Sequence, residues 1–265
     1  MKKIALLMGA LLIATVGLVG CTTKSNDTTK TTNLLESIKK QGTIKIGTEG
    51  TYAPYTFHDS TGKLVGFDVE IAEEVAKRLG VKSEFVETKW DGMLAGLDAK
   101  RFDIVVNQVG INEERKQKYD FSDPYVTSRA VLIVKSDNTT IKTFEDLKGK
   151  KAAQTLTSNL GKLAKENGAE IVTSDGFNQS IDLILAGRAD ATINDSLSFY
   201  DLKKQKPDIA VKIAAEKKDA DQNAILINKG NKELVDAINK ALADMKSDGT
   251  YLKISNKYFN TDVSK

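Results

Sequence analysis

One ten-residue pattern occurs twice in the chain and constrains the fold more than any other feature. Residues 99–108 (AKRFDIVVNQ) match residues 186–195 (AGRADATIND), 87 positions further along. Each copy follows a helical pattern of apolar residues, passes through a short turn into a strand and ends in a polar pair. A helix–turn–strand unit present twice predicts two lobes of the same design. If the pattern is only a favourable helix-to-strand connection, two α/β units still remain.

The rest of the chain alternates short strand patterns with helical patterns. Residues 43–46 alternate apolar and polar side chains, and residues 131–134 form a continuous apolar run. Residues 67–79 carry one apolar helical face that ends at Gly80, and residues 234–245 carry another. This order is typical of βαβ units that build largely parallel sheets.

The N-terminal segment indicates where the protein is located. Cys21, the only cysteine, ends an apolar run that follows two lysines and is too short to span a bilayer comfortably, and a polar tract follows it. We expect residues 1–20 to be a lipoprotein signal peptide and Cys21 to be lipidated, with residues 21–39 as a flexible tether. The alternative is an ordinary secretory signal peptide with an incidental cysteine. Either way the protein is expected outside the cytoplasm, on the outer face of the membrane or in a periplasm.

Composition argues against several classes of function. The net charge of +3 falls to +1 without Lys2 and Lys3, which argues against a nucleic-acid partner. With one histidine, His58, and no free cysteine, neither a metal cluster nor a cofactor is expected. Residues 47–50 lack the lysine of a phosphate loop and the third glycine of a dinucleotide fingerprint. Ser158 has no histidine partner for a catalytic triad.

Polar and aromatic side chains gather just after the predicted strands, which is where ligands bind in open α/β sheets. A guanidinium can bind a carboxylate through two hydrogen bonds, a carboxylate can hold an ammonium group, and aromatic faces can enclose a side chain. These groups together suit a zwitterionic ligand, although any α/β protein carries polar residues on such loops. The candidate residues are Glu49, Tyr52, Trp90, Asn107, Gln108, Gly110, Arg115, Ser158, Asn159 and Asp195.

A family resemblance covers residues 40–263. It rests on the motifs IGTEGTYAPY (46–55), GFD (66–68), WDGML (90–94), ER (114–115), DFSDPY (120–125) and DGTY (248–251). In this order they resemble the bacterial extracellular solute-binding proteins that take up polar amino acids. The sequences KWDGML (89–94) and NQV (107–109) are similar to the cystine-binding branch in particular.

The chain order and the resemblance together imply an α/β, two-lobed, periplasmic-binding-protein-like fold of type II. Each lobe is expected to be a doubly wound, mostly parallel sheet. Residues 40–126 and 223–263 are expected to form the first lobe and residues 127–222 the second, and the two chain crossings form the hinge.

The resemblance also implies a role for each candidate residue. Arg115 would hold the carboxylate of an amino acid, and Asp195 would hold its ammonium group from the second lobe. Gly110 stands where relatives commonly carry a serine or threonine, so only its backbone N–H could serve. Tyr52 and Trp90 would flank the side chain, and the remaining contacts would come from Glu49, Asn107, Gln108, Ser158 and Asn159.

The function that this implies is substrate capture for an ABC importer. The protein is expected to bind L-cystine between its lobes, to close around it as a monomer and to deliver it to a membrane permease. Another polar amino acid, such as glutamine or histidine, is the alternative ligand. A dehydratase-like enzyme of the same fold is the alternative class, but Glu49 has no obvious acid–base companion. We therefore expect no enzymatic activity.

Overall fold

The computed structural model describes residues 33–265. The expected signal peptide, the expected lipidation at Cys21 and the tether up to residue 32 lie outside the described residues. No helix within residues 33–265 is both long enough and apolar enough to cross a membrane.

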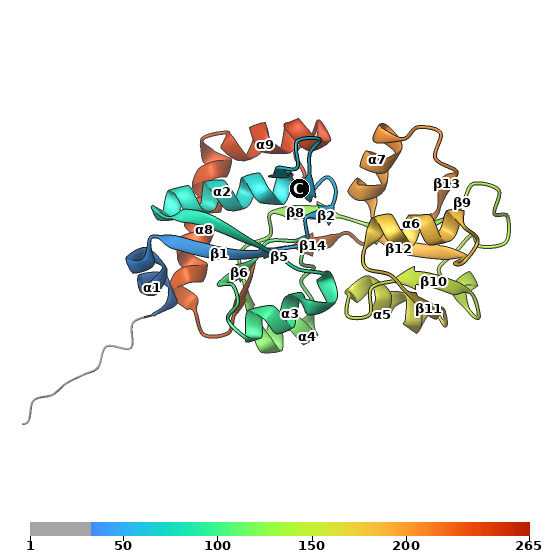
Figure 1. Cartoon of the computed structure of the whole chain (residues 1–265), viewed down its shortest axis with the longest axis horizontal. Coiled ribbons are helices and arrows are strands. Elements are labelled where there is room, and N and C mark those ends of the chain that lie inside the picture. The colour runs from blue at the N-terminus through green and yellow to red at the C-terminus, as the bar shows by residue number, and fades with distance from the viewer. Residues whose placement is uncertain (1–32) are drawn as a thin grey trace, which may run out of the picture. The chain divides into compact units, whose positions relative to one another are not determined.

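Two five-stranded sheets share one strand arrangement (Figure 1). In spatial order the first contains β5 (Lys82–Glu87), β1 (Thr43–Thr48), β6 (Ile104–Val105), β15 (Leu226–Asn228) and β7 (Tyr119–Phe121). The second contains β11 (Glu170–Thr173), β10 (Lys151–Gln154), β12 (Ala191–Asp195), β9 (Ala130–Lys135) and β13 (Val211–Glu216). In each sheet three neighbouring strands run parallel, and the fourth runs antiparallel to the third. The two α/β lobes expected from the sequence are confirmed.

The repeated pattern occupies equivalent places in the two sheets. Helix α3 (Trp90–Asp98) leads into β6, and helix α6 (Phe177–Leu185) leads into β12. Both strands take the third position in their sheet. Asn107 and Asn194, the matching residues of the two copies, therefore lie at the carboxyl ends of equivalent strands.

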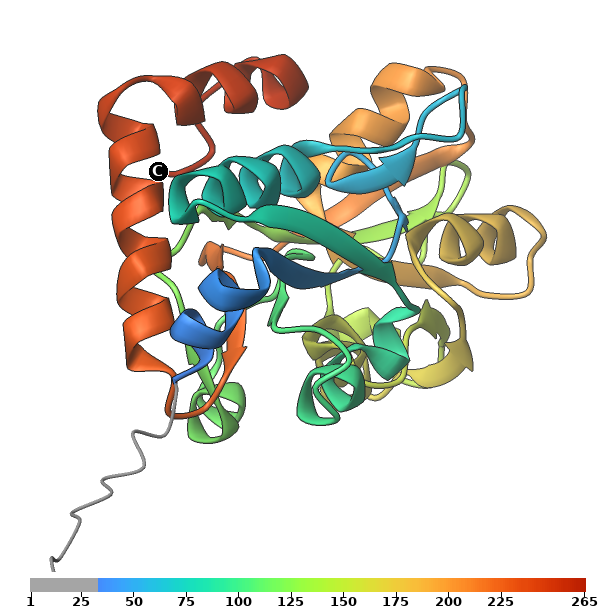
Figure 2. The ribbon, with the colours of Figure 1, turned by 60° about the vertical axis from the view of Figure 1, so that its left-hand side comes forward.

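Helices cover both faces of the first sheet (Figures 1 and 2). One face packs against α2 (Phe67–Leu79), α8 (Lys232–Ser247) and α9 (Thr250–Phe259) through a large apolar core. The other face packs against α3. Helix α4 (Glu113–Lys118) lies directly before β7 in the chain. A small sheet of β2 (Thr51–Tyr52), β3 (Thr56–His58) and β4 (Leu64–Val65) lies in the chain between β1 and α2.

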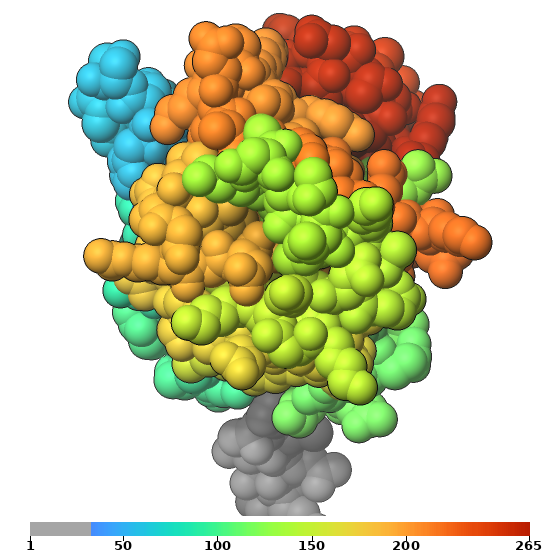
Figure 3. All heavy atoms as spheres, turned by 90° about the vertical axis from the view of Figure 1, so that its right-hand side faces the viewer, coloured from blue at the N-terminus to red at the C-terminus, as the bar shows by residue number. Residues whose placement is uncertain are grey.

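The second sheet is also covered on both faces. Helix α5 (Asn159–Glu166) and the short 3-10 helix η1 (Glu145–Leu147) contribute to the core on one face. Helices α6 and α7 (Ser196–Gln205) form the core on the other. Figure 3 shows this lobe facing the viewer, coloured from yellow-green to orange.

Side-chain caps determine where three helices begin. Asn112, Ser158 and Asp195 each accept hydrogen bonds from backbone N–H groups in the first turns of α4, α5 and α7. Because a cap fixes the first turn, it also fixes the direction of the residues there. Arg115 in α4 and Asn159 in α5 are held in this way.

Two paired strands connect the lobes. The chain leaves the first sheet through β8 (Val126–Ser128) and returns through β14 (Asp221–Asn223), and these strands form an antiparallel pair. The lobe limits expected from the sequence, 126/127 and 222/223, fall inside these strands.

The expected tether extends too far into the folded region. Helix α1 (Leu34–Gln41) occupies its last residues, with Asn33 as the cap. Ile38 is 1% exposed and belongs to the first core, and Gly42 ends the helix in the left-handed conformation at φ 73°. Since Leu34 and Ile38 lie one turn apart, they form an apolar face that docks on the lobe.

Two glycines make room for one aromatic ring beneath β1. A Cβ at Gly47 would lie 2.6 Å from Phe102 Cε2, and a Cβ at Gly96 would lie 2.7 Å from Phe102 Cζ.

We expect Gly47→Ala to lower the free energy of unfolding by about 1–3 kcal/mol through overpacking, measured by urea denaturation. Gly92→Ala in α3 is the control, because its Cβ would meet only Thr88 Oγ1, at 3.3 Å. Equal stability of the two variants would contradict this account of the packing.

Candidate functional site

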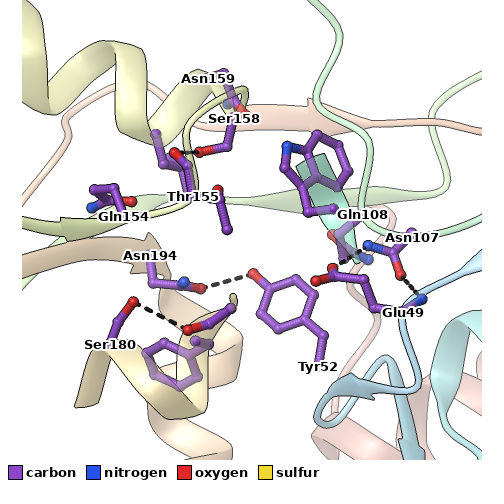
Figure 4. A pocket seen from close by; sticks show the side chains of 14 residues that line it. Glu49, Tyr52, Asn107, Gln108, Gln154, Thr155, Ser158, Asn159, Ser180 and Asn194 are labelled. Atoms are coloured by element: carbon purple, nitrogen blue, oxygen red, sulfur yellow. Dashed lines mark hydrogen bonds between the residues drawn. The ribbon is translucent and has the colours of Figure 1, made fainter. Parts of the chain in front are cut away.

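A cavity of about 70 Å³ lies between the two lobes at the carboxyl ends of their parallel strands (Figure 4). Residues from both lobes form its wall. The predicted binding residues found there are Glu49, Tyr52, Trp90, Asn107, Gln108, Ser158 and Asn159. The structure thus brings most of the candidates to one place.

Several wall residues were missed by the sequence prediction. They are Gln154, Thr155, Leu160, Gly176, Phe177, Ser180 and Asn194. Asn194 carried a signal, since it matches Asn107 in the repeated pattern. Gly176, Phe177 and Ser180 begin α6, and no motif marks them because only the approach of the lobes brings α6 to the cavity.

Glu49 and Asn107 form a reciprocal pair in the first lobe (Figure 4). The Glu49 backbone N–H donates to Asn107 Oδ1 at 2.8 Å, and Asn107 Nδ2 donates to Glu49 Oε2 at 2.6 Å. Burial raises the pKa of Glu49 from 4.5 to about 7, and the bond from Asn107 opposes this shift. The cavity therefore contains a carboxyl group that changes charge near neutral pH.

Two tyrosine hydroxyls reach from the first lobe to the second. Tyr52 donates to Asn194 Oδ1 at 2.8 Å, as Figure 4 shows. Tyr55, which the sequence analysis left outside the site, is fully buried and donates to Asp195 Oδ1 at 2.5 Å. Both bonds depend on the two lobes lying close together.

Arg115 is buried without an anionic partner. Its side chain donates to Gly110 O at 2.9 Å, and its guanidinium carbon lies 5.3 Å from the centre of the Trp90 ring. The residue is 6% exposed, and within residues 33–265 no carboxylate lies at ion-pair distance from it. Burial lowers its pKa to about 10, so it stays charged at neutral pH. It lines a hollow between α4 and α5 beside the cavity.

Asp195 is the corresponding buried anion. It is 9% exposed and accepts hydrogen bonds from Tyr55, from Ser128 Oγ and from the Leu197 backbone N–H. Burial raises its pKa, and in the described part of the chain no lysine or arginine pairs with it. It lines a small hollow together with Gln108 and Asn159.

The start of α5 joins these three spaces. Asn159 lines the cavity, the hollow at Arg115 and the hollow at Asp195. A Cβ at Gly110 would lie 3.2 Å from Asn159 Nδ2, so the missing side chain at position 110 lets Asn159 come close. Ser158 Oγ accepts from the Gly161 N–H at 2.9 Å as the helix cap. Gly110 itself lines none of the three spaces.

Direct contacts also join the lobes at the rim. The Asp91 carboxylate in α3 accepts hydrogen bonds from the Leu156 N–H at 3.1 Å, the Thr157 N–H at 2.9 Å and the Thr157 hydroxyl at 2.8 Å. Lys89 Nζ lies 2.7 Å from Asp175 Oδ2. These bonds close one side of the cleft.

Comparison with known proteins identifies the family. The model of the bacterial extracellular solute-binding proteins, family 3, matches residues 44–261. The chain belongs to this family. It is similar to the L-cystine-binding protein TcyA of Bacillus subtilis, with 49% identity and all of both chains covered. It is also similar to the L-cystine-binding protein TcyJ of Escherichia coli K12, with 43% identity and 88% of each chain covered.

Solved structures of this kind share the fold. An ancestral arginine-binding protein bound to arginine matches with a TM-score of 0.77 and 42% identity, over 82% of this chain and 98% of that one. The L-cystine solute receptor of Neisseria gonorrhoeae, in its unliganded open conformation, matches with a TM-score of 0.58 and 48% identity, over 87% and 98%. The family-3 protein described here therefore has the two-lobed type II fold expected from its sequence.

The raised pKa of Glu49 makes stability depend on pH. The folded protein keeps this proton up to about pH 7, whereas the unfolded chain loses it near 4.5. The folded state thus binds more protons between these values, and its stability falls as pH rises through them. Glu49→Gln removes this pH-dependent loss of stability and keeps a side-chain oxygen that can accept from Asn107. We expect the variant to match the wild type at pH 4.5 and to exceed it at pH 8 by at most about 3 kcal/mol.

Urea denaturation at the two pH values measures this difference. Glu84→Gln, at an exposed glutamate of β5, is the matched control and should change stability equally at both. A Glu49→Gln effect of the same size at pH 4.5 and pH 8 would contradict the assignment.

Proposed function

We propose that this protein captures L-cystine in the cleft between its lobes and delivers it to the permease of an ABC importer. The observation that carries the proposal is the pair of buried opposite charges, Arg115 in the first lobe and Asp195 in the second. Neither has an ionic partner within residues 33–265. Burying an unpaired charge is costly, and a zwitterion placed between the two residues would satisfy both.

The ligand-binding roles follow from this placement. Arg115 binds the α-carboxylate through its guanidinium, and Asp195 binds the α-ammonium. Asn159 lines both the hollow at Arg115 and the hollow at Asp195, and Tyr52 and Trp90 flank the ligand. The side chain of the amino acid occupies the cavity, where its polar contacts come from Glu49, Asn107, Gln108, Ser158, Gln154, Ser180 and Asn194.

L-cystine is favoured over other amino acids by the names of two similar proteins. TcyA and TcyJ are both L-cystine-binding proteins. The polar wall of the cavity also suits cystine, whose far end carries a second amino-acid group. Glutamine or histidine remains the alternative ligand, since a histidine-binding periplasmic protein of Escherichia coli is 34% identical.

Closure of the two lobes is the conformational change that signals ligand binding to the permease. We propose that β8 and β14 form the hinge between lobe 1 (40–126 and 223–263) and lobe 2 (127–222). The lobe arrangement is more similar to an arginine-bound structure than to an unliganded open one, although the open one is closer in sequence. A ligand that contacts both lobes stabilises the closed form, which the permease recognises.

We also propose that the protein is located outside the cytoplasmic membrane and that it is not an enzyme. Lipidation of Cys21, after removal of residues 1–20, anchors a monomer outside the cytoplasmic membrane. One solved relative is an ancestral amino-acid-binding protein described as a precursor of cyclohexadienyl dehydratase, with 40% identity. Among the described residues that line the cavity, Glu49 is the one carboxylic acid, so we propose binding without turnover. Accumulation of product from prephenate would contradict this.

Calorimetry tests the ligand. Residues 33–265, refolded to remove any amino acid carried through purification, are titrated with L-cystine, L-arginine, L-glutamine and L-histidine. Tight 1:1 binding of L-cystine alone is the expected result. Binding of another amino acid in its place would keep the uptake role and overturn the ligand. Binding of none would overturn the proposed function.

The Arg115 contact yields a further prediction. Arg115→Ala should weaken L-cystine binding by about 2–5 kcal/mol, since it removes a charge-assisted bidentate contact. The melting temperature of the variant should not fall in proportion to this loss of affinity, because the guanidinium that is removed is buried without an anion. Arg101→Ala, at an exposed arginine of the same lobe, should leave affinity unchanged. Unaltered affinity in Arg115→Ala would remove this residue from the site.

A further inference from the structure

A fully buried carboxylate outside the cavity holds one of the cavity residues. Asp68, the second residue of α2, is 0% exposed. Its Oδ2 accepts the backbone N–H of Gln108 at 2.8 Å, and its Oδ1 accepts Gln108 Nε2 at 3.2 Å. In the described part of the chain no lysine or arginine forms an ion pair with it. Both of its oxygens are thus used to hold Gln108.

These two bonds fix which end of the Gln108 amide faces the cleft. Burial raises the pKa of Asp68 to about 7, so above this pH the carboxylate is ionised and only accepts hydrogen bonds. An amide turned the other way would then place two oxygens against each other. Gln108 also has a left-handed backbone, with φ 50°, which is uncommon for a residue with a side chain. The bond from its backbone N–H to Asp68 holds this conformation in place.

The other end of the amide has no partner. Gln108 Oε1 is buried and accepts no hydrogen bond from any described residue. Gln108 lines both the cavity and the small hollow that contains Asp195. A buried acceptor without a donor costs about 1–3 kcal/mol, so this oxygen needs a donor that comes from outside the protein.

An ammonium group matches this position. It carries three donors and no acceptor. The Asp195 carboxylate already accepts hydrogen bonds from Tyr55, Ser128 and Leu197. It therefore has too few free acceptor positions to bind all three N–H groups of the ammonium. A second acceptor beside it would complete the binding of the α-ammonium.

We propose that Asp68 is a positioning residue that holds the Gln108 amide with Oε1 toward the cleft, where it accepts a hydrogen bond from the α-ammonium of the bound amino acid. This rests on the proposed function, because it needs an amino acid between Arg115 and Asp195. Asp68 itself does not touch the ligand. It makes Gln108, an amide able to donate or accept, into an acceptor only.

Asp68→Asn tests the proposal because it can turn the amide around. The asparagine can still accept the Gln108 backbone N–H, but its NH₂ group then faces the side-chain amide. Gln108 must present its oxygen to that group and its own NH₂ to the cleft, where it meets the ammonium. We expect L-cystine affinity at pH 8 to fall about 10- to 100-fold in the calorimeter. Gln108→Met, which keeps the length and removes the acceptor, should cause a loss of similar size.

The double variant separates positioning from a general structural effect. If Asp68 acts through Gln108, adding Asp68→Asn to Gln108→Met causes no further loss of affinity. Losses that multiply, or wild-type affinity in Gln108→Met, would overturn the proposal. The affinity of Gln108→Met is measured without any change at Asp68. It therefore tests the proposal even if Asp68→Asn fails to fold. Asp103→Asn, at a half-buried carboxylate of the same lobe that accepts the Lys45 N–H, is the control and should bind normally.

The wild type distinguishes this inference from the proposed function. If the wild type binds L-cystine and the variants show no coupling, only the role of Asp68 and Gln108 is wrong. If the wild type binds another amino acid of the panel, the proposed ligand is wrong, and the same cycle is measured with that amino acid, since each carries the ammonium group. If it binds none, both fail.

Discussion

Arg115 and Asp195 are buried charges of opposite sign, and the fold keeps them on different lobes without letting them neutralise each other. Each is held by its own helix start, α4 for the cation and α7 for the anion. Burial of an unpaired charge opposes folding, so the surrounding cores must supply the stability that this arrangement costs. Each lobe does so with an apolar core on both faces of its sheet. The fold itself thereby holds the two charges in place.

The polar residues around these charges serve structure and site together. Asp195 caps α7 while it faces the cleft, and Ser158 caps α5 at the point where the cavity and both hollows meet. Asn107 braces the backbone of Glu49 and also contacts its carboxyl group. Side chains committed in this way lose little further freedom on binding, which favours affinity. Substitutions there therefore affect stability and binding at once.

Contacts between the lobes set the conformational balance. Tyr52 and Asn194 meet across the cleft, and Asp91 accepts three hydrogen bonds from the loop before α5. These bonds join the two lobes directly and so favour the closed arrangement. A ligand changes the balance only through the contacts that it adds to both lobes. In the proposed function, Arg115 and Asp195 supply these contacts, one from each lobe.

The sequence by itself determined the fold class, the family and half of the residues that line the cavity. The repeat of residues 99–108 at 186–195 predicted two equivalent units, and both copies proved to be the third strand of matching sheets. Strand ends are local features, so the polar residues after β1 and β6 could be identified from the pattern alone. Helix α1 was missed because its apolar face is short and follows a polar tract.

Only the tertiary structure decided which side chains meet across the cleft. The start of α6 at Gly176 and Phe177 has no local signal, since it reaches the cavity through the approach of the lobes. Tyr55 is absent from the candidate residues identified from the sequence, yet its hydroxyl donates to Asp195, 140 positions away along the chain. Asp68 belongs to a recognisable motif, but its bonds to Gln108 depend on the contact between α2 and the end of β6. Sequence patterns record which face of an element is buried, whereas hydrogen bonds between distant segments depend on how the elements pack.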